Sequence, residues 1–141
     1  MDEFQHFVEA QAPVISRVEA ELAAGRKATH WMWFVFPQLA GLGASGMSRR
    51  YALHSLEEAR RYLDHPLLGP RLRHCTGLVN RLEGHSAHDI FGSPDDMKFH
   101  SSMTLFARAA PGEPAFRTAL EKYFGGREDA RSLELMGVRH G

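Results

Sequence analysis

An apolar stripe between residues 66 and 82 places the strongest constraint on what this chain can fold into. Its members follow one another at intervals of 4, 3, 4 and 3 residues, in the order Leu68, Leu72, Cys75, Val79 and Leu82. This spacing is typical of one face of an α-helix, and such a face must be covered by other elements. Cys75 lies within the stripe, so we expect its thiol to be a buried apolar group rather than a nucleophile.

Helix start and stop signals recur along the rest of the chain. Ser55–Glu58 and Ser86–Asp89 each predict a capping box, in which a serine hydroxyl and an acid three residues later satisfy free backbone N–H groups. Ser93 and Pro94 predict a further helix start, with the serine as cap and the proline at the first helical position. Alternation typical of strands is almost absent. The sequence therefore predicts an all-α, single-domain orthogonal bundle of about six to eight helices over residues 1–141.

The charge balance and the cysteine content narrow the functional classes. Lys plus Arg and Asp plus Glu both number 17 in 141 residues, so the formal net charge is zero. A general nucleic-acid binder usually has a basic excess, so we do not expect nucleic acid as a partner. Cys75 is the only cysteine, which rules out an intramolecular disulfide and favours a reducing cytoplasm.

The N-terminal residues and the apolar runs give no sign of export or membrane insertion. Asp2, Glu3 and Glu9 stand where a signal peptide would have a basic start and an uninterrupted apolar core. The longest apolar run, from Trp31 to Phe36, is far shorter than the roughly 20 residues that span a bilayer. We therefore expect a cytoplasmic protein without a membrane partner.

The segment Thr29–Gln38 is the most aromatic part of the chain and contains both tryptophans. One interpretation is core packing, since each large ring would bury much apolar area. The other is a pocket floor, in which Trp31 and Trp33 stack on a planar ligand such as a nucleobase while His30 and Gln38 hydrogen-bond to it. The sequence leaves both interpretations open.

A glycine-rich loop follows the aromatic segment. Leu39–Gly46 contains three glycines and no phosphate-loop motif, so we expect a mobile loop able to close over a ligand. Arg49, Arg50 and Tyr51 follow this loop. The two arginines either belong to a solvated face or bind a phosphate that enters the loop.

A second group of polar side chains stands at helical spacing between Asp95 and Thr104. Lys98, Ser101 and Ser102 complete it. One interpretation is a solvated helix face with an Asp95–Lys98 ion pair, and the other is the lining of a site for a phosphate or carboxylate. The spacing matches no specific signature of a Ser–Lys hydrolase.

Nine histidines do not form a metal-binding pattern. His85 and His88 are three residues apart, but no HExxH motif and no cysteine pair accompanies them. We therefore expect neither a metal nor a cofactor.

Four motifs together resemble the bacterial domain-of-unknown-function family eighteen-ten, over nearly the whole chain. They are Gly25-x-Lys27-x-x-His30-Trp31-x-Trp33-Phe34-x-Phe36-Pro37-Gln38, Arg50-Tyr51-Ala52, His65-Pro66-x-Leu68-Gly69-x-Arg71-Leu72, and Phe91-Gly92-Ser93-Pro94-Asp95-Asp96-x-Lys98-x-x-Ser101-Ser102-Met103-Thr104-Leu105-Phe106. The resemblance implies a small, mainly helical cytoplasmic protein and no established activity. The polar motif residues that it implies are His30, Gln38, Tyr51, Asp95, Lys98, Ser101, Ser102 and Thr104.

A fainter similarity connects the chain to the NADAR proteins, helical enzymes that act on ADP-ribose and related N-glycosides. It rests on His65-Pro66-x-Leu68 at the start of a leucine-striped helix and on the pair Phe91-Gly92. The NADAR motif of tryptophan and glutamate is not clearly present, because Gln38 stands where an acid is needed and an amide does not titrate. Asp95 or Asp96 would have to replace that acid.

Three functional hypotheses follow from the sequence. The first is a pocket for a small phosphorylated or nucleotide-like ligand, the second a NADAR-like N-glycoside hydrolase, and the third a module that binds other proteins. The first requires that Gln38 and Lys98 converge on one cleft. The predicted ligand-binding residues are His30, Trp31, Trp33, Gln38, Arg50, Tyr51, Asp95, Lys98, Ser101, Ser102 and Thr104.

Overall fold

The computed structural model describes residues 2–137, which form ten helices and no strand. The prediction of an all-α fold is confirmed. Seven helices have at least seven residues, and α3, α4 and α7 are single turns that raise the total above the expected number. The helices are α1 (Gln5–Gln11), α2 (Ile15–Ala23), α3 (Met32–Val35), α4 (Gly46–Arg50), α5 (Leu56–Asp64), α6 (Leu68–Arg81), α7 (Ala87–Phe91), α8 (Asp95–Ala109), α9 (Pro114–Phe124) and α10 (Ala130–Met136).

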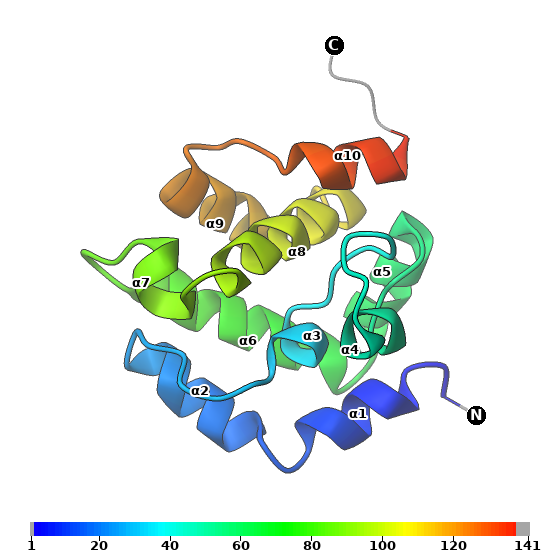
Figure 1. The fold of residues 1–141 in the computed structure, drawn as a ribbon, viewed down its shortest axis with the longest axis horizontal. Helices are drawn as coiled ribbons and strands as arrows, with labels where there is room; N and C mark the ends of the chain where they lie inside the picture. The colour runs from blue at the N-terminus through cyan, green and yellow to red at the C-terminus, as the bar shows by residue number, and fades with distance from the viewer. Residues whose placement is uncertain (1, 138–141) are drawn as a thin grey trace.

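Helix α8 runs through the middle of the molecule, with α1 and α2 on one side and α9 and α10 on the other (Figure 1). It packs against α3, α5, α7, α9 and α10. Nine of its fifteen residues are buried, among them Phe99, Met103 and Phe106. Because α8 is covered on most sides, it gives the polar residues near its start a rigid support.

The apolar stripe forms helix α6 as predicted. Leu68, Leu72, Cys75 and Val79 are all buried, and the face they make packs against α2, α5 and α9. Burial raises the pKa of the Cys75 thiol to about 12. The thiol therefore stays protonated at neutral pH and behaves as a small apolar group, as the sequence indicated.

The capping predictions were partly right. Ser86 and Asp89 form the complete capping box of α7. The Ser55 hydroxyl accepts from the backbone N–H of Glu58, but the Glu58 carboxylate accepts from the backbone N–H of His54 rather than of Ser55. The predicted start of α8 was wrong, because the helix begins at Asp95 and no side chain caps it.

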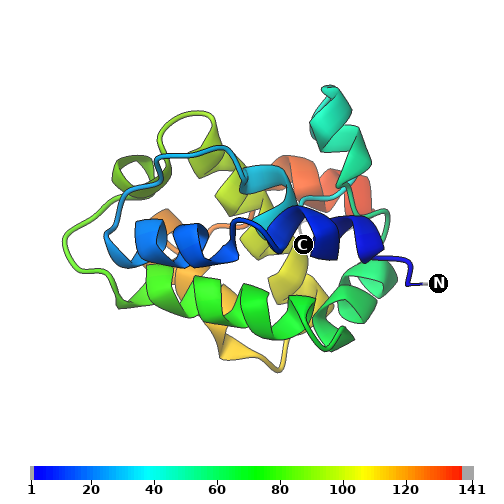
Figure 2. The same ribbon diagram turned by 90° about the horizontal axis from the view of Figure 1, so that it is seen from below.

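The aromatic segment makes the single turn α3 and then enters the glycine-rich loop. A parallel bridge between Leu39 and Leu53 pins the two ends of this loop, through hydrogen bonds from Leu53 N to Gln38 O (3.0 Å) and from Ala40 N to Leu53 O (2.7 Å). The chain between Leu39 and Leu53 comprises this loop and α4, which stands out from the helical body when the molecule is seen from below (Figure 2). The bridge therefore fixes where the loop leaves and rejoins the core.

Candidate functional site

Two neighbouring cavities border the glycine-rich loop, the large one between this loop and the first turns of α8 and the small one between the loop, Trp33 and the residues around α4. The large cavity has a volume of about 440 Å³ and is lined by Gln38, Leu42, Gly43, Ser48, Met97, Lys98, Ser101, Asp129 and Arg131. The small cavity has a volume of about 120 Å³ and is lined by Trp33, Gln38, Leu39, Ala40, Gly41, Gly43, Ser48, Arg49, Tyr51, Ala52 and His54. Gln38, Gly43 and Ser48 line both, so they form the junction between the two spaces.

Lys98 connects the central helix to the aromatic segment. Its ammonium group lies 5.0 Å from the ring centre of Trp33, a favourable cation–π distance, and 3.5 Å from a carboxylate oxygen of Asp95. The side chain of Lys98 lines the large cavity and that of Trp33 the small one. Their contact is a second link between the cavities.

Asp95 also binds a second lysine, which lines neither cavity. Lys27 lies 2.9 Å from its carboxylate, and the lysine side chain is only 6% exposed. The same ammonium group donates to the carbonyl of Thr29 at 2.6 Å and lies 5.0 Å from the ring centre of Trp31. Asp95 therefore joins two lysine–tryptophan pairs, of which one is buried and the other borders the large cavity.

The carboxylate of Glu21 anchors the segment that precedes α3. It accepts hydrogen bonds from the backbone N–H groups of Ala28 and Thr29, the Thr29 hydroxyl and the Trp31 indole N–H. Burial alone would raise the pKa of Glu21, but the hydrogen bonds from Thr29, Ala28 and Trp31 outweigh it and lower the pKa to about 2. The segment is therefore held by an ionised carboxylate throughout the physiological pH range.

Asp129 is the only carboxylate that lines either cavity within the described part of the chain. Its Oδ2 caps α10 by accepting from the backbone N–H of Ser132. The same oxygen also accepts from the hydroxyl of Ser132 and from that of Ser101 on α8. Its backbone N–H donates to the Thr104 hydroxyl at 2.9 Å. Two hydroxyl residues of α8 thus fix the start of α10 against the large cavity.

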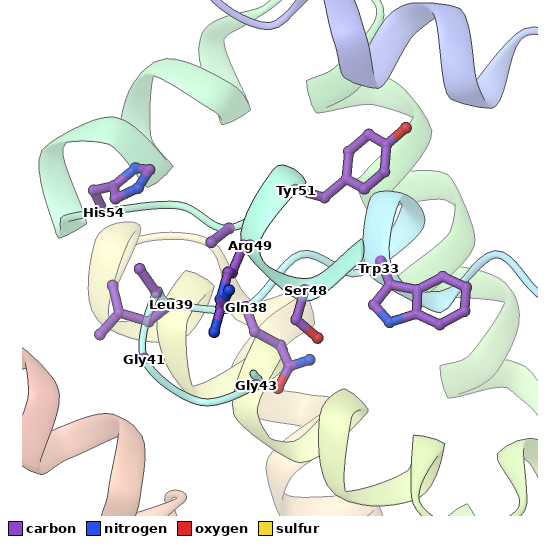
Figure 3. A pocket seen from close by; sticks show the side chains of 11 residues that line it. Trp33, Gln38, Leu39, Gly41, Gly43, Ser48, Arg49, Tyr51 and His54 are labelled. Atoms are coloured by element: carbon purple, nitrogen blue, oxygen red, sulfur yellow. The ribbon is translucent and has the colours of Figure 1, made fainter. Parts of the chain in front are cut away.

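The loop side of the small cavity is built mainly by α4. Ser45 caps this short helix, and its hydroxyl also donates to the Ser48 hydroxyl at 2.9 Å. Figure 3 shows the side chains of Gln38, Ser48 and Arg49 directed toward the space between the loop and α4, whereas the ring of Tyr51 points away from it. Gln38, Ser48 and Arg49 therefore give the small cavity an amide, a hydroxyl and a guanidinium group, and His54 adds an imidazole.

The structure brings together five of the residues proposed from the sequence. Gln38, Lys98 and Ser101 line the large cavity, and Gln38, Trp33 and Tyr51 the small one. Gln38 and Lys98 thus share a cleft, the convergence that the first hypothesis requires. Tyr51 contributes little side-chain surface, because it is 8% exposed and its ring packs against Phe7 and Phe34.

The other proposed residues line neither cavity, and the candidate site must be corrected accordingly. Trp31 is 1% exposed and belongs to the core. Ser102 is also fully buried, and Thr104 uses its hydroxyl to bind the backbone at His100 and Asp129. These side chains sit on the inner face of their segments, which a linear motif does not reveal.

His30 and Arg50 lie outside both cavities, and Asp95 contacts the lining residue Lys98 without lining a cavity itself. His30 is exposed and outside both cavities. Arg50 donates to the Tyr51 hydroxyl at 3.3 Å, and its neighbour Arg49 reaches the small cavity instead. Asp95 positions Lys98 from outside the cavity wall.

Sequence reasoning missed several lining residues, above all Ser48, Asp129 and Arg131, and it selected Arg50 rather than Arg49. The choice between Arg49 and Arg50 depends on the register of a helix of five residues, which is too short to show a periodic pattern. Asp129 had a usable signal, because Asp129 and Ser132 have the spacing of an N-terminal cap. Their proximity to Lys98 arises only from the packing of α10 on α8.

Metal and membrane features were searched over the described residues. Between residues 2 and 137, no three or more His, Cys, Asp or Glu side chains are grouped so that they could hold a metal ion. Within the same range, no helix has both the length and the apolar character needed to cross a bilayer.

The fold and the cavities define a class: a small all-α protein with a polar cleft between a glycine-rich loop and its central helix. The family model described as "Protein of unknown function (DUF1810)" matches residues 1–136, and the chain belongs to this family. The resemblance inferred from the four motifs is thereby confirmed. A comparison with curated proteins finds no match.

A solved structure is also closely similar. The crystal structure of the conserved hypothetical protein Rv1873 from Mycobacterium tuberculosis, at 1.38 Å, is 58% identical in sequence and superposes with a TM-score of 0.94. The match covers 97% of this chain and 98% of that chain. The helical architecture is therefore shared with a bacterial relative along almost its whole length.

Proposed function

We propose that the large cavity binds a small phosphorylated, nucleotide-like ligand. The observation that carries the proposal is the position of Lys98, whose ammonium group contacts the Trp33 ring while its side chain lines the same cavity as Gln38 and Arg131. Lys98 and Gln38 thus offer an anion contact and a hydrogen-bonding group in the large cavity, and the Trp33 indole lies directly beside the cation.

The size and charge of the cavity agree with such a ligand. Its volume of about 440 Å³ lies within the usual range of roughly 300–1,000 Å³ for small-molecule sites. Lys98 and Arg131 contribute positive charge and Asp129 contributes one negative charge. Asp95, outside the lining, is shared with Lys27, so it does not cancel the charge of Lys98 alone. The lining as a whole therefore favours an anion.

The protein-binding module is less well supported. With the aromatic segment serving only as core, such a module would have two fully buried tryptophans and no polar cavity. Trp33 is instead partly exposed, and polar side chains from the aromatic segment, α4, α8 and the start of α10 face a shared cleft. These features favour a small-molecule site over a purely structural role for the segment.

Tryptophan fluorescence tests the proposal directly, because the chain has two tryptophans and only Trp33 borders a cavity. Titration with adenosine 5′-monophosphate should quench the emission of the wild-type protein, and Trp33→Phe should remove that response. Lys98→Ala should weaken binding by about tenfold or more, the loss of one charge-assisted hydrogen bond.

Arg17→Ala is a matched control for loss of a cation, because Arg17 is exposed on α2 and lines neither cavity. This variant should bind as the wild type does. A flat titration and an unchanged melting temperature across purine and pyrimidine nucleotides, sugar phosphates and inorganic phosphate would refute the proposal.

Asp129 favours a second candidate function, the NADAR-like hydrolysis of N-glycosides. Hydrolysis needs a group that can take or give a proton, and Asp129 is a carboxylate in the large cavity where Gln38 cannot serve. The test is release of the base from ADP-ribose or from nucleosides, followed by chromatography. Asp129→Asn should abolish release while keeping the helix cap, because asparagine also caps well. Absence of release by the wild type would leave ligand binding as the function.

A further inference from the structure

The small cavity enters the proposal above only through Trp33, although it opens next to the large one. Its volume of about 120 Å³ is well below the roughly 300–1,000 Å³ of a typical small-molecule site. A space of this size is too small for a whole nucleotide and suits one phosphate-sized group. It is therefore better described as part of a site than as a site by itself.

The two cavities meet at a neutral, hydrogen-bonding junction. Gln38 contributes an amide, Ser48 a hydroxyl and Gly43 no side chain at all, and these three residues line both spaces. The contact between Lys98 and Trp33 joins the cavities at a second point. A ligand that extends from one cavity to the other would pass uncharged polar groups in between.

Each cavity has its own cation. Arg49 lines the small cavity, and no carboxylate is among the residues that surround it there. Lys98 and Arg131 line the large cavity, where Asp129 offsets one of the two charges. The carboxylate of Asp129 already accepts from Ser101 and Ser132. The arrangement is thus positive at both ends and neutral in the middle.

We propose that the two cavities are halves of one binding site for a ligand with two separate anionic groups, one at Arg49 and the other at Lys98 and Arg131, joined by a neutral hydroxylated part. This inference rests on the proposed function and specifies its ligand class. A sugar that bears phosphates at two positions has this chemistry, since its ring oxygens and hydroxyls can bond to Gln38 and Ser48.

Gly43 is the residue that keeps the junction open. A Cβ atom built at this position would lie 2.6 Å from the Cβ of Ser48 and would also collide with its hydroxyl oxygen. The Cβ of Ser48 cannot rotate away, so a side chain at position 43 must push α4 and the loop apart or close the junction. Of the three loop glycines, Gly43 is the one at which an added Cβ would collide with Ser48 at the junction, since Gly41 faces Leu135 and Gly46 faces open space.

The experiment compares two probes by calorimetry, adenosine 5′-monophosphate with one anionic group and adenosine 3′,5′-bisphosphate with two. The wild type should bind the bisphosphate at least about tenfold more tightly, as expected for one additional charge-assisted contact. Arg49→Ala should remove this advantage and leave monophosphate binding within about twofold, because an exposed arginine in the other cavity does not contact the single phosphate. Lys98→Ala should weaken both probes.

Gly43→Ala tests the junction, and a second substitution, Ser48→Gly, should reverse its effect. It should weaken the bisphosphate by about tenfold or more and the monophosphate much less. Gly43→Ala combined with Ser48→Gly removes the colliding atoms and should restore bisphosphate binding to the level of Ser48→Gly alone. Melting curves of all variants show whether each chain is folded.

The outcomes separate this inference from the proposed function. Equal affinity of the wild type for the two probes, or equal weakening of both by Gly43→Ala without rescue, overturns the two-part site and leaves a mononucleotide site intact. Failure of the wild type to bind either probe overturns both proposals. Bisphosphate binding that depends on Arg49 and is restored by the double variant supports the two-part site.

Discussion

Two lysine–tryptophan pairs share the carboxylate of Asp95, yet their surroundings differ. Lys27 and Trp31 are both buried, and the lysine also donates to a backbone carbonyl. Lys98 and Trp33 have the same 5.0 Å spacing between ammonium group and ring centre, but both are partly exposed beside the cavities. The same pair of residue types thus stabilises the interior in one place and borders the cavities in the other.

This difference shows what determines the role of such a pair. The buried pair has its hydrogen-bonding capacity used by protein groups: Glu21 for the Trp31 indole, and Asp95 and Thr29 for the lysine. The cavity pair keeps capacity for another molecule. The comparison predicts that stability depends on the buried pair and ligand binding on the cavity pair.

The largest expected effect is that of Lys27→Ala. Removal of one partner from a buried ion pair leaves the other charge with too few partners, so we expect a loss of about 3 kcal/mol in the free energy of unfolding. Urea denaturation measures this loss. A loss of unfolding free energy as small as that of an exposed lysine would show that the Lys27 side chain, although only 6% exposed, does not stabilise the interior.

Glu21→Gln should have the next largest effect, about 2 kcal/mol, because a carboxylate that accepts four hydrogen bonds is replaced by a neutral amide. The pH dependence has a defined sign. The pKa of Glu21 is about 2 in the folded state against an ordinary 4.5, so its stabilisation is complete above pH 4.5 and is lost as the pH falls toward 2.

Urea denaturation at pH 7, 4 and 3 measures both effects of Glu21→Gln. The variant should lack the part of the acid destabilisation that this carboxyl causes. Glu134→Gln on α10 is the matched control, since its carboxylate is exposed. An unchanged pH profile in Glu21→Gln would contradict the assignment.

Trp31→Phe and Trp33→Phe compare the two rings directly. Trp31→Phe should cost about 1.5 kcal/mol, because Glu21 loses an indole donor and the core loses volume, whereas Trp33→Phe should cost about 0.5 kcal/mol or less. Acrylamide quenching gives a second readout. The Trp33→Phe protein retains only the buried tryptophan and should resist quenching, and the opposite result would exchange the roles of the two rings.

Lys98→Ala should also have a small effect on stability, below about 0.5 kcal/mol, because a partly exposed ion pair and one cation–π contact contribute little each. Thermal denaturation measures this effect. The same variant should have the largest effect on nucleotide binding. A loss of stability equal to that of Lys27→Ala would erase the contrast between the two pairs.

Much of the fold could be predicted from local patterns. The stripe of α6 and the capping box of α7 depend on contacts between residues a few positions apart, and both formed as expected. The predicted cap at Ser93 failed, although its local pattern was favourable, because α8 begins only at Asp95. Local signals therefore predicted the positions of the helices more accurately than the residues at which the helices begin.

The candidate site was only half visible in the sequence. Gln38 and Lys98 were chosen for their chemistry, and packing brought them to one cavity. Arg49, Asp129 and Arg131 entered the site through the orientation of two short helices, α4 and α10. Trp31 and Ser102 do not belong to the site, because each lies on the buried side of its segment.

The sequence by itself determined the all-α class, the main helices and the family, because apolar period, capping residues and motifs are properties of neighbouring positions. Only the tertiary structure decided which tryptophan is core and which borders a cavity. That choice depends on the way α3 rests on α8 and on the bridge that pins the loop beside it. Contacts between segments far apart in the chain set the exposure of a side chain. Exposure in turn distinguishes the stabilising role of Lys27 from the position of Lys98 beside the cavities.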